Sequence, residues 1–193
     1  MQLMYYQCMI IQPKEYVLKN GLKVVVKTPE IDDALNLINH IIAVAGSTHF
    51  LLSEPKDFQK YLDDIDLEKE LLRQYREGKN YMFAVFLDGR IIANSNLTFH
   101  NHVKDQHRSR VGIAIQKEYW NLGIGTILFK EMIETAKNTP GIEQVELGVI
   151  NTNERAKHLY EKMGFKKVGT LPRQLKLVDG TYYDEDMMVL FLA

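Results

Sequence analysis

The chain has 193 residues, a single cysteine and a formal net charge of −1. This length suits one domain, which can bury enough apolar surface to fold without a disulfide or a metal. The lone Cys8 excludes a disulfide within the chain, is expected to be a small buried hydrophobe, and fits a reducing, cytoplasmic compartment. The charge balance lacks a basic footprint for nucleic acid, and no apolar run approaches the ~20 residues that span a membrane.

The chain up to residue 78 is expected to be mainly helical. Residues 1–11 lack the basic leader and cleavage site of a signal peptide, so we interpret them as an N-terminal strand or arm. A valine-rich run predicts a strand over residues 22–27. Apolar residues at helical spacing then predict a helix over residues 31–45, a second helix after Pro55 and a third that ends at Gly78.

From residue 81 onward, strands alternate with two helices. Residues 81–87 and 90–97 flank the pair Asp88-Gly89, which predicts a hairpin because glycine tolerates a positive φ. Residues 103–110 are polar and are expected to form a loop. The remaining predicted elements are a strand over 111–115, a helix over about 125–139, a strand over 144–149, a helix capped by Asn153, and strands over 165–169 and 182–192.

The order of these elements is one strand, two helical segments (the helix over 31–45 and the pair of helices between Pro55 and Gly78), three strands, a helix, a strand, a helix and two strands. This order indicates a mixed α/β fold with a central mixed sheet and helices on both faces. No internal repeat or low-complexity linker divides the chain, so we expect one domain over residues 1–193.

A turn rich in glycine joins the strand that ends at Ile115 to the helix that follows it. Glycine lets the backbone approach a ligand closely, and the first turn of a helix presents unpaired N–H groups with a partial positive charge. The turn is therefore expected to bind a phosphate group through main-chain donors. The alternative is a tight connection in which the glycines only permit packing. The turn consists of Asn121, Leu122, Gly123, Ile124, Gly125 and Thr126.

Other phosphate-binding patterns fit this turn poorly. The P-loop pattern would need a Lys-Ser/Thr ending, which is absent. The dinucleotide fingerprint would need a glycine where Leu128 stands.

Two segments of the chain resemble motifs of the GNAT acetyltransferases. Residues 113–128 resemble motif A, whose signature is Arg/Gln-x-x-Gly-x-Gly/Ala, although Trp120 stands at the Arg/Gln position. Residues 153–165, with the sequence NERAKHLYEKMGF, resemble motif B in the right order and at the right separation. The resemblance covers most of the chain and implies the GNAT fold, a mostly antiparallel sheet with a splayed strand pair. It also implies a helical acceptor-side part over about 29–78 and an acetyl-CoA-binding part over about 81–193.

The resemblance implies acetyl-CoA as the cosubstrate, without a metal. The splayed strand would pair its backbone with the pantetheine, the glycine-containing turn would hold the pyrophosphate, and a side chain at the start of the last helix would hydrogen-bond the cofactor arm or only cap that helix. The residues that the resemblance assigns to these roles are Ile113, Ala114 and Ile115 for the strand, Asn121 to Thr126 for the turn, and Asn153 for the cap.

Tyr160 matches the family tyrosine that stands near the thioester sulfur. A phenol with a pKa of about 10 can protonate a leaving thiolate, so the resemblance implies a general acid, and the alternative is a core aromatic. Some relatives place a glutamate, acting as the base, at the position of Gly148, which has no side chain. Glu146 shares that strand face and is the leading substitute. The alternatives are that Glu146 is only a solvated strand-end charge, or that the protein has no base and water removes the proton. A backbone N–H near Ile115 would stabilise the oxyanion.

These features predict an acetyl-CoA-dependent N-acetyltransferase that moves an acetyl group by direct attack of a primary amine, on a small molecule or a protein. The alternative function is a non-catalytic acyl-CoA-binding or regulatory module of the same fold. The expected partners are acetyl-CoA and the amine acceptor, without nucleic acid or a membrane, and a homodimer is left open.

The acceptor pocket is expected between the early helices, residues 100–107 and residues 169–183. The acidic run Asp184-Glu185-Asp186 either attracts a cationic amine or forms a solvated edge. The three histidines of the polar loop, His100, His102 and His107, lack the spacing of a metal site, so no metal is expected.

Overall fold

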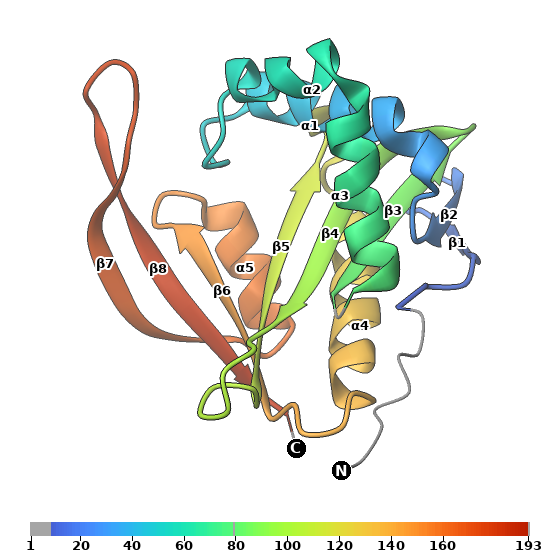
Figure 1. Cartoon of the computed structure of the whole chain (residues 1–193). Coiled ribbons are helices and arrows are strands. Elements are labelled where there is room, and N and C mark those ends of the chain that lie inside the picture. Colours follow the sequence, from blue (N-terminus) through green and yellow to red (C-terminus); the bar gives the residue numbers. More distant parts are fainter. Residues whose placement is uncertain (1–8, 79, 193) are drawn as a thin grey trace.

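The computed structural model describes residues 9–78 and 80–192, and its centre is one eight-stranded sheet (Figure 1). The strand order is β1-β2-β3-β4-β5-β6-β8-β7. Every neighbouring pair is antiparallel except β5 and β6, which are parallel, so the predicted mixed, mostly antiparallel sheet is confirmed. The strands are β1 (Lys14–Val17), β2 (Lys23–Lys27), β3 (Tyr81–Leu87), β4 (Arg90–Phe99), β5 (Arg108–Ile115), β6 (Gln144–Ile150), β7 (Lys166–Lys176) and β8 (Tyr182–Phe191).

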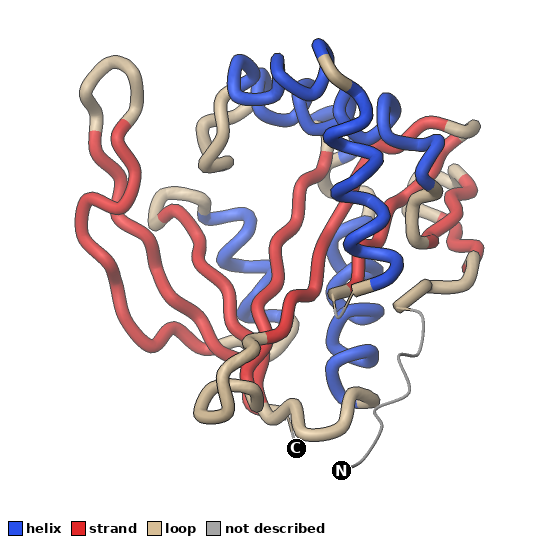
Figure 2. Tube along the Cα trace, in the orientation of Figure 1, coloured by secondary structure: helices blue, strands red, loops and turns tan. Residues whose placement is uncertain are grey.

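Helices cover both faces of the sheet, as the element order predicts (Figure 2). α1 (Ala34–Ser47) and α3 (Ile65–Glu77) pack on one face, and α4 (Ile124–Lys137) and α5 (Glu154–Lys162) pack on the other. The short α2 (Gln59–Asp63) lies between α1 and α3 in the chain. None of the helices in the described ranges is long and apolar enough to cross a membrane.

Strand β3 lies between the two helical layers, and both of its faces are buried. Met82, Ala84 and Phe86 belong to the core cluster that contains Leu37 of α1. The alternate residues Phe83, Val85 and Leu87 belong to the larger cluster beneath α4 and α5. A strand buried on both faces is nearly all apolar, as β3 is.

Several local predictions are confirmed. The hairpin turn between β3 and β4 holds Asp88 at φ 48° and Gly89 at φ 78°. α3 ends at Glu77, immediately before Gly78. Asn153 caps α5 with its side-chain Oδ1, which accepts a hydrogen bond from the Ala156 N–H at 3.3 Å.

Other boundaries predicted from the sequence are wrong. β5 begins at Arg108, so residues 108–110 are strand and not loop, because they pair with the start of β6 through main-chain groups. β7 continues to Lys176, well past Gly169, because its mostly exposed residues still pair with β8. The first described strand is β1, while residues 9–11 have no regular structure. Residues 1–8, including Cys8, lie outside the described residues.

The parallel pair β5 and β6 is short, and this creates the main opening of the molecule. Their ladder joins Arg108 to Gln144 and Arg110 to Glu146 and then stops. Beyond it the two strands separate, as Figure 1 shows, while β5 remains paired with β4 up to Ile115. One edge of β5 over residues 111–115 therefore has no neighbouring strand in the described sheet.

Candidate active site

A cleft of about 770 Å³ occupies the gap between β5 and β6. Its walls are residues 110–115 of β5, residues 147–150 of β6, the start of α4 and one side of α5. Ile113, Ala114 and Ile115 lie in this wall at the free edge of β5. A free strand edge offers alternate N–H and C=O groups to an extended ligand, as a neighbouring strand would.

The glycine-containing turn lies at one end of the cleft and leads into α4. Asn121 and Gly123 have left-handed backbones, with φ of 63° and 99°, and α4 begins at Ile124. Within the described ranges, no side chain caps this helix and no acidic residue stands in its first turn. Its first N–H groups and its positive dipole end therefore form a site for an anion.

The second glycine of the turn has a packing role. A Cβ at Gly125 would lie 2.6 Å from Cδ2 of Leu159, a distance too short for two carbon atoms. Gly125 therefore lets α4 approach α5 closely. Gly123 differs, because a Cβ there would meet only Lys19 Cγ at 3.9 Å and its positive φ is the constraint.

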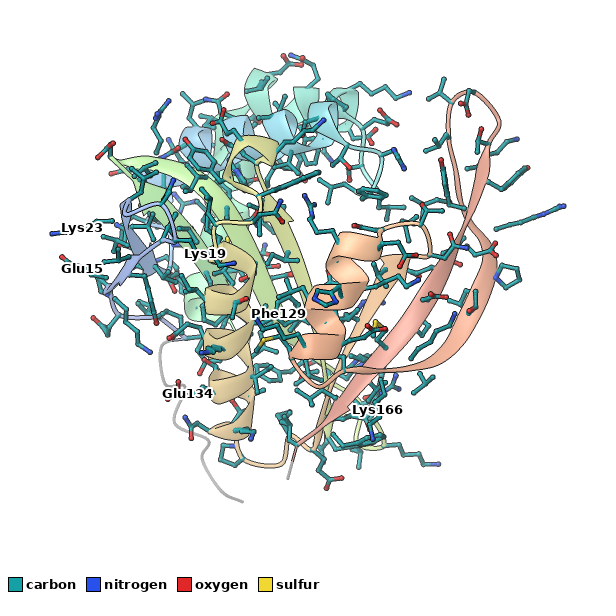
Figure 3. The ribbon with its side chains drawn as sticks, turned by 180° about the vertical axis from the view of Figure 1, so that it is seen from behind. Glu15, Lys19, Lys23, Phe129, Glu134 and Lys166 are labelled. Atoms are coloured by element: carbon teal, nitrogen blue, oxygen red, sulfur yellow. The ribbon has the colours of Figure 1, made fainter. Side chains whose placement is uncertain are left out.

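Residues outside the predicted set also reach this end of the cleft. Lys19, in the β1–β2 turn, donates its main-chain N–H to the Leu122 carbonyl at 3.1 Å, and its side chain lines the cleft. Figure 3 shows Lys19 beside the start of α4. No local motif marks Lys19 in the sequence, because only the pairing of β2 with the sheet brings it there.

Trp120 and Arg155 form a stacked pair beside the turn. The indole Nε1 of Trp120 donates to the Ile115 carbonyl at 2.8 Å, which holds the ring against the end of β5. The Arg155 guanidinium carbon lies 3.0 Å from the ring centroid, and Arg155 lines the cleft. Trp120 thus positions the Arg155 guanidinium, which α5 supplies. The two residues are 35 positions apart, so the local motif does not reveal their contact.

Tyr160 lies in the cleft wall and is 7% exposed. Its ring packs against Phe129 of α4, with centroids 5.0 Å apart, and Figure 3 shows Phe129 on the side of α4 that faces α5. Burial raises the pKa of Tyr160 to about 12, and the charge of Arg155 opposes this rise. The phenol is therefore protonated at neutral pH and can donate a proton but not accept one. Asn153, besides capping α5, lines the same cleft.

Glu146 lies elsewhere, at the closed end of the strand pair, and is not among the residues that line the cleft. Its Oε2 accepts hydrogen bonds from Arg108 Nη2 at 2.7 Å and Nε at 3.2 Å. Its Oε1 lies 3.0 Å from Nε2 of His100. These partners hold the short β5–β6 ladder together, and the structure does not bring Glu146 to Tyr160.

The part of the cleft that the early helical segment and the β7–β8 segment line is mainly apolar. Two of the three segments predicted for the acceptor pocket line it, the early helical part and the β7–β8 segment, whereas residues 100–107 do not. His49 stacks on Tyr183 of β8, with centroids 5.1 Å apart, and so connects the segment after α1 to the β7–β8 hairpin. The lining residues of this part are Val44, Thr48, Phe50, Leu51, Leu52, Gln174, Leu175 and Glu185.

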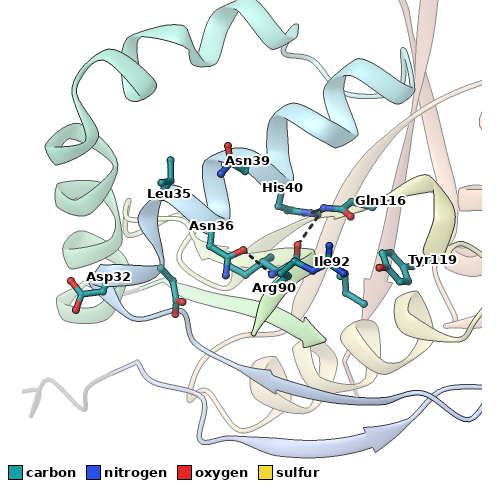
Figure 4. Close-up of a pocket in the computed structure, with 11 residues that line it drawn as sticks. Asp32, Leu35, Asn36, Asn39, His40, Arg90, Ile92, Gln116 and Tyr119 are labelled. Atoms are coloured by element: carbon teal, nitrogen blue, oxygen red, sulfur yellow. Dashed lines mark hydrogen bonds between the residues drawn. The ribbon is translucent and has the colours of Figure 1, made fainter. Parts of the chain in front are cut away.

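A second cavity of about 500 Å³ lies between α1 and the start of β4 (Figure 4). Burial lowers the pKa of His40 to about 4, so its imidazole is neutral. Gln116 Nε2 donates to His40 Nδ1 at 3.1 Å, and His40 Nε2 therefore carries the proton and donates to Asn94 Oδ1 at 3.0 Å. This network fixes the end of β5 to α1.

Within the described ranges no three His, Cys, Asp or Glu side chains gather as metal ligands.

Comparison with known proteins identifies the family of this architecture. The model of the acetyltransferase (GNAT) family matches residues 47–165. The L-amino acid N-acetyltransferase AaaT of Escherichia coli K12 is 29% identical over 98 residues, a match that covers 51% of this chain and 60% of that protein. The chain thus spans less than two thirds of the first curated relatives that it matches.

Two solved structures share the fold. A GNAT acetyltransferase from Streptococcus pneumoniae has a TM-score of 0.79 and 25% identity, over 88% of this chain and 99% of that chain. The structure of yncA from Salmonella typhimurium, with its cofactor acetyl-CoA, has a TM-score of 0.74 and 13% identity, over 88% of this chain and 94% of that chain.

Proposed function

Because this chain belongs to the acetyltransferase (GNAT) family, we propose that it transfers the acetyl group of acetyl-CoA to a primary amine. The observation that carries this proposal is the cleft between β5 and β6, which joins an anion site at the start of α4 to the buried hydroxyl of Tyr160. We propose acetyl-CoA and the amine as its partners and the cytoplasm as its compartment.

The chemistry of the cleft fits coenzyme A. The first turn of α4 would hold the pyrophosphate through main-chain N–H groups, and Lys19 and Arg155 would add positive charge on either side of it. The free edge of β5 over residues 111–115 would bind the amide groups of the pantetheine arm as a partner strand. Asn153 would contact that arm from the start of α5.

The acetyl thioester supplies an activated carbonyl carbon for attack by an amine. Tyr160 would place its hydroxyl proton at the thioester sulfur as the carbon–sulfur bond breaks, because its phenol is fully protonated at neutral pH. A backbone N–H near Ile115 would stabilise the negative charge that develops on the carbonyl oxygen. These groups favour a catalytic function over a non-catalytic acyl-CoA-binding module, which has no need for a buried phenol in the cleft.

Release of free thiol tests this proposal directly. The purified chain is incubated with acetyl-CoA and a panel of primary amines that includes amino acids, a polyamine and peptides with free N-termini. We expect thiol release that depends on both the protein and one class of amine. Binding of acetyl-CoA without thiol release for any amine would support the non-catalytic module instead.

A further inference from the structure

An amine acceptor is mostly protonated at neutral pH, so it must lose a proton before its nitrogen can attack. The cleft is poor in groups that accept protons. Four cationic side chains line it, from Lys19, Arg110, Arg155 and Lys162. Among the described residues that line the cleft, the only carboxylate belongs to Glu185.

Glu185 reaches the cleft because of the register of β8 and the missing side chain at Gly148. Glu185 pairs with Ile150 of β6, and Gly148 pairs with Met187, so Glu185 and Gly148 are diagonal neighbours. A Cβ at Gly148 would lie 2.2 Å from Glu185 Oε1 and 2.5 Å from its Cδ. The carboxylate of Glu185 therefore occupies the space that a side chain at position 148 would fill.

The two acidic neighbours of Glu185 have other roles. Asp184 Oδ1 accepts a hydrogen bond from the main-chain N–H of Arg173 at 2.8 Å. Asp186 is 1% exposed and pairs with Lys167 at 2.6 Å and with the Thr170 hydroxyl at 2.8 Å. The acidic run is thus neither a solvated edge nor a uniform patch, because strand alternation places Glu185 on the opposite face of β8 from Asp184 and Asp186.

Other proton acceptors are less well placed. Both oxygens of Glu146 are occupied by Arg108 and His100 outside the cleft. His158 lines the cleft but stands two residues before Tyr160 on α5, and residues two apart on a helix face different sides. Glu185 lies on the opposite wall from α5, in the mainly apolar part of the cleft with Leu51 and Leu175.

We propose that Glu185 is the general base of this acetyltransferase and that its carboxylate reaches from β8 into the space beside Gly148. This inference rests on the proposed acetyl transfer. The carboxylate takes one proton from the acceptor ammonium and releases it to water. The neutral nitrogen then forms a bond to the acetyl carbon, and the carbon–sulfur bond breaks. The thiolate takes the Tyr160 proton, and the second proton of the nitrogen restores the phenol.

The first test is Glu185→Gln, which keeps the shape of the side chain and removes its basicity. We expect kcat/KM for the amine to fall about 10²-fold near pH 7.5, within the usual range for a general base, with the affinity for acetyl-CoA unchanged. The loss is expected to shrink toward about pH 10, where much of the amine is already deprotonated. The matched control is Asp184→Asn on the same strand, which makes the same charge change and is expected to keep its activity.

The second test moves the carboxylate to the neighbouring strand. Gly148→Ala alone should displace the Glu185 side chain and lower the activity. Glu185→Gly should lower it further, and adding Gly148→Glu to Glu185→Gly should restore at least a tenth of the original kcat/KM. Such recovery requires a carboxylate in one shared space, which a purely structural role for Glu185 would not produce.

Several results would overturn the inference. Equal kcat/KM for Glu185→Gln and the unmodified chain at all pH values would show that Glu185 is not the general base. A raised KM with an unchanged kcat would assign Glu185 to amine binding without proton transfer. A chain that binds acetyl-CoA but acetylates no amine would contradict both the proposed function and the general-base role of Glu185. An active chain whose activity does not change when Glu185 is substituted would contradict only the general-base role.

Discussion

The surroundings of Tyr160 determine which proton chemistry its hydroxyl supports. The ring is held between α4 and α5 by contacts with Phe129 and Phe165, at centroid distances of 5.0 Å and 6.3 Å. Burial raises the pKa of its phenol to about 12, which excludes a base at neutral pH and suits an acid. In the proposed mechanism, Tyr160 both packs between the helices and donates a proton, so a substitution must preserve its packing to test the proton transfer.

Tyr160→Phe meets that requirement because it removes only the hydroxyl. We expect kcat to fall about 10-fold or more, since the thiolate would leave without a proton, while the affinity for acetyl-CoA stays nearly unchanged. Steady-state kinetics and calorimetry measure the two quantities separately. Unchanged turnover would remove Tyr160 from the mechanism, and a large drop in melting temperature would show that the variant disturbs packing instead.

At the residue scale, the sequence predicts what is local and misses what depends on pairing between distant segments. The Asn153 cap and the positive φ of Gly89 follow from motifs a few residues long. The stacking of Arg155 on Trp120 and the position of Glu185 over Gly148 do not, because they require the placement of α5 and the register of β8. Arg155 lies against Trp120, and Glu185 lies against Gly148. Because Trp120 and Gly148 are the two positions that depart from the family pattern, these departures are the signal in the sequence that points to both contacts.

At the scale of single elements, α3 carries a carboxyl group in an unusual place. Glu68 is 4% exposed and has no hydrogen-bond or ion-pair partner among the described residues. Burial raises its pKa from 4.5 to about 7. The folded protein therefore holds a proton on Glu68 more tightly than the unfolded chain does, and the stability that results is complete at low pH and is lost as the pH rises through about 7.

Glu68→Gln is expected to remove this pH dependence. The variant should be more stable than the unmodified chain by roughly 1–3 kcal/mol at about pH 8 and similar to it at about pH 4. Denaturant unfolding at the two pH values measures the difference. Parallel stability curves for the two proteins would show that Glu68 does not titrate between those values.

The strands show where predictions from periodicity fail. Apolar β3 and the hairpin to β4 were predicted within a few residues, because burial on both faces leaves a clear apolar run. The polar composition of residues 103–110 predicts a loop where β5 begins, and the strand predicted over 165–169 ends before the far half of β7. Both segments are strands because main-chain pairing needs no apolar side chain, and β7 is an exposed edge.

At the scale of the whole molecule, one short parallel ladder connects two halves of the sheet. β1 to β5 form an antiparallel half with α1 and α3 on one face, and β6, β8 and β7 form the other half. The pair between Glu146 and Arg108 lies at the point where the halves join, and beyond it they diverge to form the cleft. The sequence predicts the order of the elements after β1. It does not predict this junction, because residues 108–110 have no apolar pattern.

In the proposed function, this arrangement would place ligand recognition mainly on the backbone. The turn before α4 and the free edge of β5 offer main-chain groups, so the Arg/Gln position of the family motif can carry Trp120 without loss of the anion site. Gly123 is the residue on which that site depends, because its φ of 99° is costly for any side chain with a Cβ.

Calorimetric titration of acetyl-CoA into the unmodified chain and into Gly123→Val measures whether the turn before α4 holds the cofactor. We expect saturable binding by the unmodified chain, with one site per chain, and affinity at least about 10-fold weaker for the variant, because the branched side chain shifts the turn away from its left-handed backbone. A folded variant that binds acetyl-CoA as tightly as the unmodified chain would show that the turn does not hold the cofactor. An unmodified chain without saturable binding would show that the cleft is not a coenzyme A site.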